Sequence, residues 1–305
     1  MANITAALVK ELRDRTGAGM MDCKKALVAA DGDIEVAIDN MRKNGQAKAA
    51  KKAGRIAAAG VIAYAANDSK AFLVEINCET DFVARDAGFN EFCNNVARIA
   101  LEKNVTDVEA LKNETYTGTS DTVQTTLTNL IAKIGENMSV RRVASLEGSN
   151  LGIYIHSNKL IGVIASLEGG DAQLSHDIAM HICASAPQYI TKEEAPQDQI
   201  EHERQIQTEI TEKEEAENVA AGKKAKPANV LANIIEGRIN KRFDELSLVT
   251  QDFVKDGTKK VGQVLKEGNA TVKTFVRFKV GEGIEKKEVD FAAEVAAQVA
   301  AAQGK

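Results

Sequence analysis

The sequence predicts an α+β fold that contains two related units, each a β-hairpin followed by a helix. Apolar runs joined by turn residues occur twice, as GVIAYAA-NDSK-FLVEINC and as LGIYIHS-NK-LIGVIASLEG, and a helical stretch follows each. With 44% apolar but only 4% aromatic residues and no Trp, the core must be built from Ala, Val, Ile and Leu. Such a core favours helices and small sheets. At 305 residues the chain has room for two or three domains.

Residues 1–45 predict a small bundle of three helices. The first helix ends at TGAG, the second runs from Met21 to Ala30, and the third follows the turn DGD and ends at Gly45. The core of so small a bundle is thin, so we expect it to pack against a neighbour. The next stretch, QAKAAKKAGRIAAAG, is expected to be a stiff, solvated Ala/Lys helix that connects the bundle to the rest.

The two hairpin units make up the predicted core. The helix DAGFNEFCNNVARIA follows the first hairpin, and the helix DTVQTTLTNLIAKIG then leads into the strand SVRRVASLE. The helix after the second hairpin, LSHDIAMHICASA, stops at Pro187. We expect each hairpin to bury one face under its own helix.

Residues 191–244 predict an antiparallel helical hairpin that stands out from the body. Sparse isoleucines form a narrow apolar stripe on two polar helices, joined by the turn GKKAKPAN. The pattern fits a solvated decoration and a dimerisation arm equally well. Beyond it, TVKTFVRFKVGEGIE alternates like a strand that rejoins one of the sheets, and DFAAEVAAQVAAA predicts a closing helix.

Composition and charge exclude several classes of protein. No apolar run reaches the length of a membrane helix, and MANITAALVKEL is too polar for a signal peptide, so we expect a soluble, cytoplasmic protein. Net charge is −5, but residues 1–55 hold 11 Lys/Arg against 7 Asp/Glu, which is +4. An acidic chain is a poor binder of nucleic acid, whereas its basic N-terminal segment suits an acidic protein surface.

The sequence contains no familiar catalytic or metal-binding frame. Phosphate loops, dinucleotide fingerprints, GxSxG and HExxH are all missing, and the four cysteines are scattered without a CxxC pair. We therefore predict no catalytic residue, no cofactor and no metal, and we expect the cysteines to be buried, reduced thiols.

Three apolar residues at element ends are the candidates for a binding surface. Met20 and Met21 begin a helix after a glycine-rich turn, and we expect one of them to cover the core of its own bundle. Phe82 lies in ETDFVAR, at a strand-to-helix junction. Its ring either packs under its own helix or is displayed for another molecule.

Several long blocks, in the same order along the chain, resemble bacterial elongation factor Ts. They are TGAGMMDCKKAL, GDIEVAIDNMRKNG, KKAGRIAAAG, ETDFVARDAGF, AKIGENMSVRRVASLEG, DIAMHICASAP and VGEGIEKKEVDFAAEVAAQ. The match is weakest across residues 193–228. The family is the guanine-nucleotide exchange factor for elongation factor Tu, the GTPase that carries aminoacyl-tRNA to the ribosome.

The resemblance implies a domain organisation. It comprises a ubiquitin-associated-like three-helix domain at 1–54, core subdomains at 55–145 and at 146–190 with 245–280, a coiled-coil arm at 191–244 and a C-terminal helical module at 281–305. Family members often form homodimers, so a homodimer, or a heterotetramer with elongation factor Tu, is compatible with the resemblance.

The resemblance also implies which residues bind the GTPase. The matching positions are Arg13, Met20, Met21 and Lys24 in the N-terminal domain, Thr80, Asp81, Phe82 and Val83 in the TDFVA motif, and Ile134, Gly135, His156 and Val254 in the core. In the family, the TDFVA aromatic wedges between helices of the GTPase near its magnesium and phosphate site. The rival hypothesis is a non-catalytic adaptor that tethers partners through its three-helix domain.

Two positions depart from the family pattern. In QDFVKD, Asp252 stands where a proline is usual, and Lys255 replaces an apolar residue. Both flank Val254. The arm is also longer and more acidic around EKEEAEN than the family pattern implies.

Overall fold

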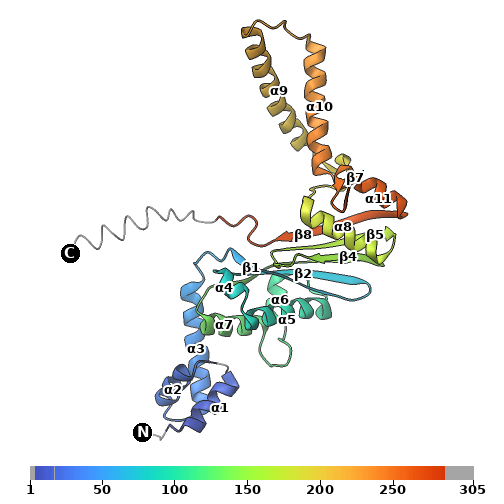
Figure 1. Cartoon of the computed structure of the whole chain (residues 1–305). Helices are drawn as coiled ribbons and strands as arrows, with labels where there is room; N and C mark the ends of the chain where they lie inside the picture. The colour runs from blue at the N-terminus through green and yellow to red at the C-terminus, as the bar shows by residue number, and fades with distance from the viewer. Residues whose placement is uncertain (1–3, 17, 286–305) are drawn as a thin grey trace, which may run out of the picture.

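A computed structural model describes residues 4–16 and 18–285. The molecule is an elongated α+β structure, with a helical bundle at one end, two small sheets in the middle and a helical arm at the other end (Figure 1). The α+β class predicted from the sequence is confirmed. The predicted closing helix DFAAEVAAQVAAA lies outside the described residues. No helix in the described ranges is long and apolar enough to cross a membrane.

The N-terminal bundle comprises α1 (Ala6–Thr16), α2 (Met20–Ala29) and α3 (Ile34–Lys52). Its small core is built from Leu12, Cys23, Leu27 and Ala37, with partly buried neighbours. Asp33 caps α3, because its carboxylate accepts a hydrogen bond of 3.0 Å from the N–H of Val36. The three predicted helices are confirmed.

The predicted end of the third helix at Gly45 is wrong. Helix α3 continues to Lys52, and Gly45 is buried in its interior. A Cβ added there would lie 3.5 Å from the Cβ of Ala132 on α7, an ordinary contact distance, so the glycine lies where α3 crosses α7. The connector expected after Gly45 is therefore no free-standing helix, because QAKAAKK forms the last turns of α3 along α7.

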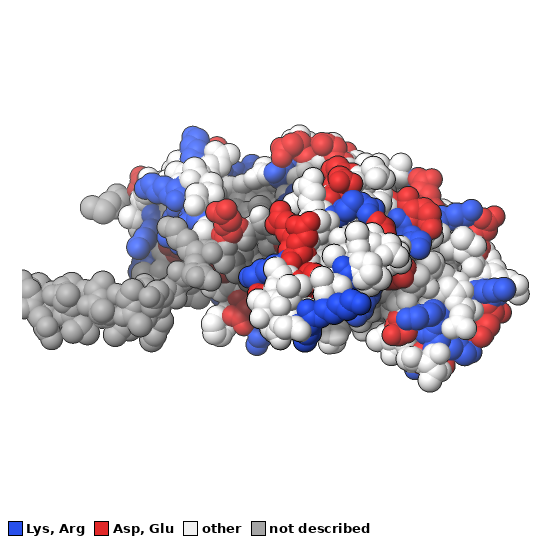
Figure 2. All heavy atoms as spheres, turned by 90° about the horizontal axis from the view of Figure 1, so that it is seen from above, with Lys and Arg blue, Asp and Glu red and all other residues white. Residues whose placement is uncertain are grey.

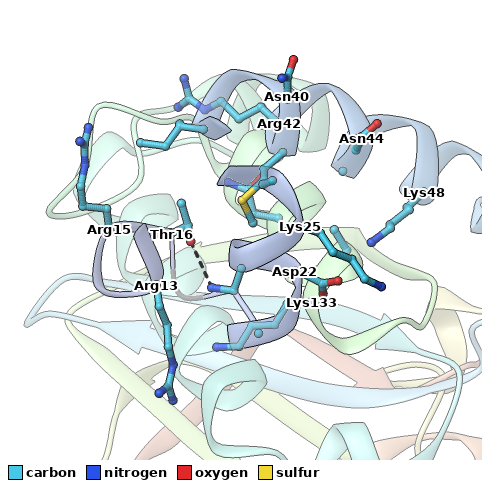
Figure 3. Close-up of a pocket in the computed structure, with 18 of the residues that line it drawn as sticks. Arg13, Arg15, Thr16, Asp22, Lys25, Asn40, Arg42, Asn44, Lys48 and Lys133 are labelled. Carbon is cyan, nitrogen blue, oxygen red and sulfur yellow. Dashed lines mark hydrogen bonds between the residues drawn. The ribbon is translucent and has the colours of Figure 1, made fainter. Parts of the chain in front are cut away.

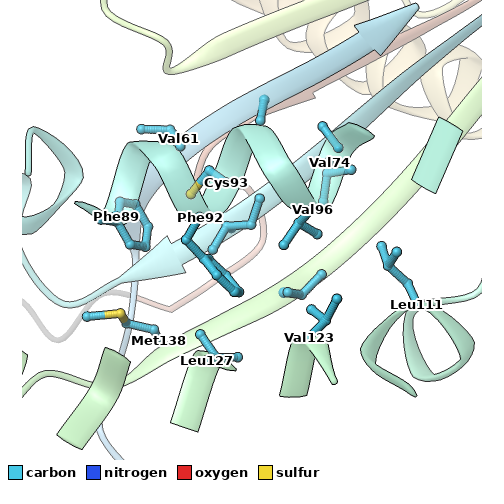
Figure 4. Close-up of a cluster of buried hydrophobic side chains, with 14 of the residues drawn as sticks. Val61, Val74, Phe89, Phe92, Cys93, Val96, Leu111, Val123, Leu127 and Met138 are labelled. Carbon is cyan, nitrogen blue, oxygen red and sulfur yellow. The ribbon is translucent and has the colours of Figure 1, made fainter. Parts of the chain in front are cut away.

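The first sheet is antiparallel, in the order β1-β2-β3. Helices α5 and α7 cover one of its faces, and Figure 4 shows their side chains converging with Val61 and Val74 of the sheet. Phe89 and Phe92 of α5 supply the aromatic part of this core. The elements are β1 (Ala59–Ala66), β2 (Lys70–Cys78), β3 (Met138–Glu147), α5 (Ala87–Lys103), α6 (Val108–Asn113) and α7 (Val123–Ile134).

The second sheet is also antiparallel, in the order β4-β5-β8, and α8 (Ala172–Ser185) covers it. Its strands are β4 (Asn150–Ile155), β5 (Ile161–Gly169) and β8 (Ala270–Lys279). Strand β8 pairs with β5, which confirms that the C-terminal strand rejoins a sheet. Between the arm and β8, the short elements β6 (Asp252–Phe253), β7 (Asp256–Lys260) and α11 (Val261–Glu267) were not predicted, and α6 was not predicted in the first unit.

The two sheets pack against each other through the faces that their helices leave open. Ile62 and Leu73 of the first sheet meet Ile164 and Phe278 of the second in one buried cluster. The middle of the molecule is thus layered, with α5 and α7 on one side and α8 on the other (Figure 1).

The arm consists of α9 (Gln197–Ala220) and α10 (Ala228–Leu246), as predicted. The buried apolar cluster of the arm lies at its base, around Ile239 and Phe243. Further out the helices are joined by ion pairs, and Figure 2 shows acidic and basic side chains interleaved on the face seen from above. Arg204–Glu236 and Arg238–Glu214 join α9 to α10, and Lys226–Glu215 joins the turn between the helices to α9.

The predicted apolar stripe of the arm is only partly correct. Ile206 and Ile210 are exposed, whereas Thr211 and Glu215 are buried. Isoleucine spacing predicted the helix but assigned the wrong residues to its inner face, because Thr211 and Glu215 lie there and bind Arg238 and Lys226 respectively.

Candidate partner-binding site

Phe82 lies on α4 (Asp81–Ala84), a single helical turn between β2 and α5, and its side chain is 82% exposed. Two caps isolate this turn. Thr80 Oγ1 caps α4 by accepting a hydrogen bond of 3.3 Å from the N–H of Val83. The Asp86 carboxylate caps α5 by accepting one of 2.9 Å from the N–H of Phe89, in the first turn of that helix. Val83, 7% exposed, packs into the core. Phe82 is one position earlier on the turn and points away, so its ring is displayed.

A second segment is bound to this turn. The carboxylate of Glu136 accepts two hydrogen bonds from Thr80, 3.0 Å from the backbone N–H and 2.7 Å from the hydroxyl. Glu136 follows Gly135, which ends α7 in a left-handed conformation with φ +91°. Two predicted contact segments, Thr80–Val83 and Ile134–Gly135, are therefore brought together.

His156 lies near the same turn. It is exposed in the β4–β5 turn, whose Lys159 donates a hydrogen bond of 2.7 Å to Asn90 Oδ1. The Asn90 amide in turn donates one of 2.8 Å to the carbonyl of Ala84 in α4. A chain of two hydrogen bonds thus connects the His156 turn to the Phe82 turn.

Met20 and Met21 both lie on the surface of the N-terminal bundle. They are 58% and 64% exposed, so the expectation that one of them covers the bundle core is wrong. Cys23 and Leu27, on the opposite side of α2, fill that core instead. Arg13 and Lys24 are exposed as well.

A basic cleft of about 1540 Å³ lies between the N-terminal bundle and α7. Figure 3 shows Lys25, Lys48 and Lys133 around it, together with Asp22. Arg15 and Arg42 also line the cleft but are engaged, with Glu35 and Asp121 respectively. Sequence reasoning found the positive charge of this segment but missed the cleft, because α7 comes from residues about a hundred positions away.

Val254 is exposed in the turn between β6 and β7, which lies toward the arm, far along the molecule from α2 (Figure 1). Its backbone N–H donates a hydrogen bond of 3.2 Å to Nδ1 of His181, a buried residue of α8. The other ring nitrogen, Nε2, lies 2.9 Å from Gln251 Oε1. This pair of contacts requires a neutral ring protonated at Nε2, and burial lowers the pKa of His181.

The two departures from the family pattern have structural partners. Lys255 Nζ forms an ion pair of 2.8 Å with Asp177 of α8, and Asp252 pairs with Lys260 at 2.6 Å across the β6–β7 turn. Charged contacts therefore hold the turn in this chain.

The exposed side chains described above suit a surface that binds another protein. An exposed aromatic ring on a braced turn, two exposed methionines and a basic cleft can bury apolar area and meet acidic groups. The four thiols are free and buried, and burial raises the pKa of Cys78 to about 12 and that of Cys93 well above its usual range. Within the described ranges, no group of three or more His, Cys, Asp or Glu side chains could hold a metal ion.

The chain is similar to one family of known proteins over most or all of its length. The family described as Elongation factor TS matches residues 79–282. A protein named Elongation factor Ts from Tolumonas auensis is 53% identical over 304 residues, which cover 100% of both chains. Its counterpart from Aeromonas salmonicida is 54% identical over 303 residues, 99% of both chains. The one from Psychromonas ingrahamii is 54% identical over 298 residues, 98% of both chains.

Proposed function

This chain belongs to the elongation factor Ts family of translation elongation factors, and we propose that it releases GDP from elongation factor Tu by inserting Phe82 near the magnesium and phosphate site of that GTPase. The observation that carries the proposal is the display of the Phe82 ring, 82% exposed on a turn fixed by Val83 and Thr80. We propose that this takes place in the cytoplasm.

Exchange requires thermodynamic coupling between two ligands of the GTPase. The factor must bind the nucleotide-free form more tightly than the GDP-bound form, and GDP then weakens the factor's own binding by the same ratio. Burial of one phenylalanine contributes about 1.5–3 kcal/mol. Since each tenfold in affinity is about 1.4 kcal/mol, Phe82 accounts for roughly one to two orders of magnitude.

The remaining coupling is assigned to a wider contact surface. Near Phe82, we propose that Asp81, Ile134, Gly135 and His156 contact the GTPase, while Thr80 and Val83 hold the turn from behind. Val254 extends this surface toward the arm.

The N-terminal domain, residues 1–54, is proposed to grip a second side of the nucleotide-binding domain through Met20 and Met21. Arg13 and Lys24, which are exposed and form no ion pair with the residues that the structure describes, would meet acidic groups there. The packing of α3 along α7 supports two separate contacts with the GTPase, because it holds the bundle at a fixed distance from the Phe82 turn.

A nucleotide-release measurement tests the proposal. Elongation factor Tu loaded with fluorescent GDP is mixed in a stopped-flow instrument with the wild-type chain, with Phe82→Ala, or with Tyr64→Ala. Tyr64 is an exposed aromatic residue of β1 outside the proposed surface, so it is the matched control. We expect wild type and Tyr64→Ala to accelerate release equally, and Phe82→Ala to lose roughly tenfold or more.

Two outcomes would contradict the proposal. If Phe82→Ala released GDP as fast as wild type, the wedge would be excluded. If the wild-type chain bound the GTPase without accelerating release, the adaptor hypothesis would hold instead.

A further inference from the structure

We propose that Glu136 is the positioning residue that sets the direction and rigidity of the Phe82 ring, an inference that rests on the proposed function. Glu136 is partly buried and lies at the α7–β3 junction, 54 positions from Phe82 along the chain. Its carboxylate engages Thr80, the residue that caps the Phe82 turn.

The Thr80 hydroxyl transmits this contact into the turn. It donates a hydrogen bond of 2.7 Å to Glu136 Oε1 and accepts one of 3.3 Å from the N–H of Val83. Since a hydroxyl rotates freely until its proton has an acceptor, the carboxylate orients the lone pairs that cap α4. The second carboxylate oxygen holds the backbone N–H of Thr80 at 3.0 Å, so the turn cannot swing about that residue.

The contact is reciprocal. Glu79 Oε1, beside Thr80, accepts a hydrogen bond of 2.6 Å from the N–H of Asn137, beside Glu136. Each segment thus supplies one carboxylate to the backbone of the other. Hydrogen bonds to an ionised acceptor are stronger than neutral ones, and this pair of them clamps the two segments together.

The clamp also reaches the N-terminal bundle. Lys52, the last residue of α3, donates from Nζ to the carbonyl of Gly135. Arg55 lies 3.5 Å from the Glu79 carboxylate, and its carbonyl accepts a hydrogen bond of 2.7 Å from the Asn137 amide. Glu136 therefore lies between two sets of contacts. Its neighbour Gly135 is bound by the N-terminal bundle, and its own carboxylate binds the turn that carries Phe82.

The turn needs such an external restraint. A helix of four residues is far below the length at which a helix is stable by itself. Val83 is the one buried side chain on α4. The other ion pair of the turn, Asp81–Arg85 at 2.9 Å, is exposed to solvent and contributes little. Three partly buried polar contacts remain. Asn90 donates to the carbonyl of Ala84, the Cys78 thiol donates to the carbonyl of Thr80, and Glu136 accepts from Thr80. Of these three, the Glu136 contact is the one with a carboxylate acceptor.

A fluorescence measurement tests the positioning directly. The chain contains no Trp, so Phe82→Trp introduces the single indole of the protein at the tip of the turn. Time-resolved anisotropy then reports how freely that side chain moves. In this background we compare Glu136→Gln, which can accept only one of the two Thr80 hydrogen bonds, with Glu91→Gln, a change at an exposed position on α5.

We expect Glu136→Gln to increase the amplitude of the fast anisotropy decay while Glu91→Gln leaves it unchanged. Thr80→Val removes the hydroxyl at similar side-chain volume and should reproduce the Glu136→Gln result. It also replaces that variant if Glu136→Gln fails to fold. Equal anisotropy decays in the Glu136, Thr80 and control variants would overturn the proposal.

A double-mutant cycle connects the position to exchange. Glu136→Gln is expected to slow GDP release by roughly tenfold at saturating factor when Phe82 is present. It should have no further effect in Phe82→Ala, because a support has no function without the ring it supports. Multiplicative losses would show that Glu136 acts independently of Phe82 and would overturn the inference.

The two proposals fail separately. If Phe82→Ala leaves GDP release unchanged, the wedge is excluded, while the anisotropy arm still decides whether Glu136 holds the turn. If the anisotropy is unchanged but Phe82→Ala slows release, the wedge stands and the role of Glu136 does not.

Discussion

The carboxylate of Glu75 and the backbone N–H of Gly281 are 206 residues apart in the chain and 2.8 Å apart in space. Glu75 is fully buried in β2, and its carboxylate also binds Arg141 at 3.1 Å and Arg142, both on β3. Gly281 follows β8 of the second sheet and has φ +72°. One carboxylate thus joins the middle of the first sheet to the turn that leaves the second.

Replacing this carboxylate should destabilise the protein strongly. Removal of one member of a buried ion pair leaves the remaining charges unmatched and costs about 3–5 kcal/mol. We expect Glu75→Ala to lower the free energy of unfolding by about 3 kcal/mol, the low end of that range, because Arg141 and Arg142 can still reach solvent. Urea denaturation measures the change, and Glu91→Ala, at an exposed position on α5, is the control. A loss no greater than that of the control would show that the junction is held by apolar packing alone.

The strand that contains Glu75 could be predicted, but its environment could not. FLVEINC alternates well enough to indicate β-structure. Its charged member is buried because Arg141, Arg142 and Gly281 meet it from two other segments. Periodicity contains no information about such distant partners.

The two exposed methionines test the second proposed contact surface. Removing residues 1–54 would be a poor test, because it would strip α3 from α7 and expose the face around Ala132. The substitutions Met20→Ser and Met21→Ser avoid this problem, since both side chains lie on the surface. We expect each to weaken binding to elongation factor Tu by roughly tenfold, about 1.4 kcal/mol, without lowering the melting temperature.

Isothermal titration calorimetry with nucleotide-free elongation factor Tu measures this effect. Val28→Ser is a useful control, because Val28 is exposed on the same helix but lies outside the predicted set. Unchanged affinity in both methionine variants would remove the N-terminal bundle from the contact surface.

Two glycines within helices should be replaceable by alanine with a gain in stability. Gly45 in α3 and Gly237 in α10 both have helical surroundings, and glycine in a helix interior costs roughly 0.5–1 kcal/mol relative to alanine. A Cβ at Gly45 would meet Ala132 at 3.5 Å, an ordinary contact distance, and at Gly237 it would meet nothing within 4 Å. We expect both variants to melt at a higher temperature.

Calorimetry of Gly45→Ala, Gly237→Ala and Gly60→Ala checks this result. Gly60 is the contrasting case, because it has φ +140° and a Cβ there would lie 2.2 Å from the carbonyl oxygen of Ile76. That variant should be destabilised. If Gly45→Ala were destabilised as well, α3 and α7 would lie closer together at Gly45 than the 3.5 Å contact with Ala132 implies.

Secondary structure was predicted correctly where it depends on residues that are close together in the sequence. Helices α1, α2, α9 and α10, both hairpins and the strand β8 follow from periodicity and turn residues. Gly45 misled because its usual role as a helix stop was overridden by the packing of α3 on α7. For Phe82 the sequence left two choices open, and the buried Val83 beside it decides between them.

The exposure of the two methionines and the contact of Glu136 with Thr80 could not be predicted from the sequence, because both depend on tertiary contacts. For Met20 and Met21, the core of the bundle was already filled by residues from three helices. For Glu136, the partner Thr80 lies 56 positions earlier in the chain. A glutamate after a helix-ending glycine has no distinctive sequence signal.

His181 should make the stability of the protein depend on pH. Burial lowers its pKa below the ordinary 6.5, so between the folded and unfolded pKa values the unfolded chain binds more protons than the folded one. The free energy of unfolding contributed by this group therefore decreases as pH falls below 6.5 and is unaffected at higher pH. Protonation at Nδ1 would also break the hydrogen bond that His181 accepts from the N–H of Val254.

Urea denaturation at pH 7.5 and at pH 5.5 measures this dependence. His181→Gln should lose part of the difference that wild type shows between the two conditions, whereas His202→Gln, exposed on α9, should keep it. Because the Val254 turn is held by the neutral ring, GDP release should also be slower in His181→Gln than in His202→Gln at pH 7.5. If His181→Gln and wild type lost the same stability on acidification, the proton uptake would belong to other groups. If release were equal in the two variants, the turn would be held well enough by the Lys255–Asp177 pair alone.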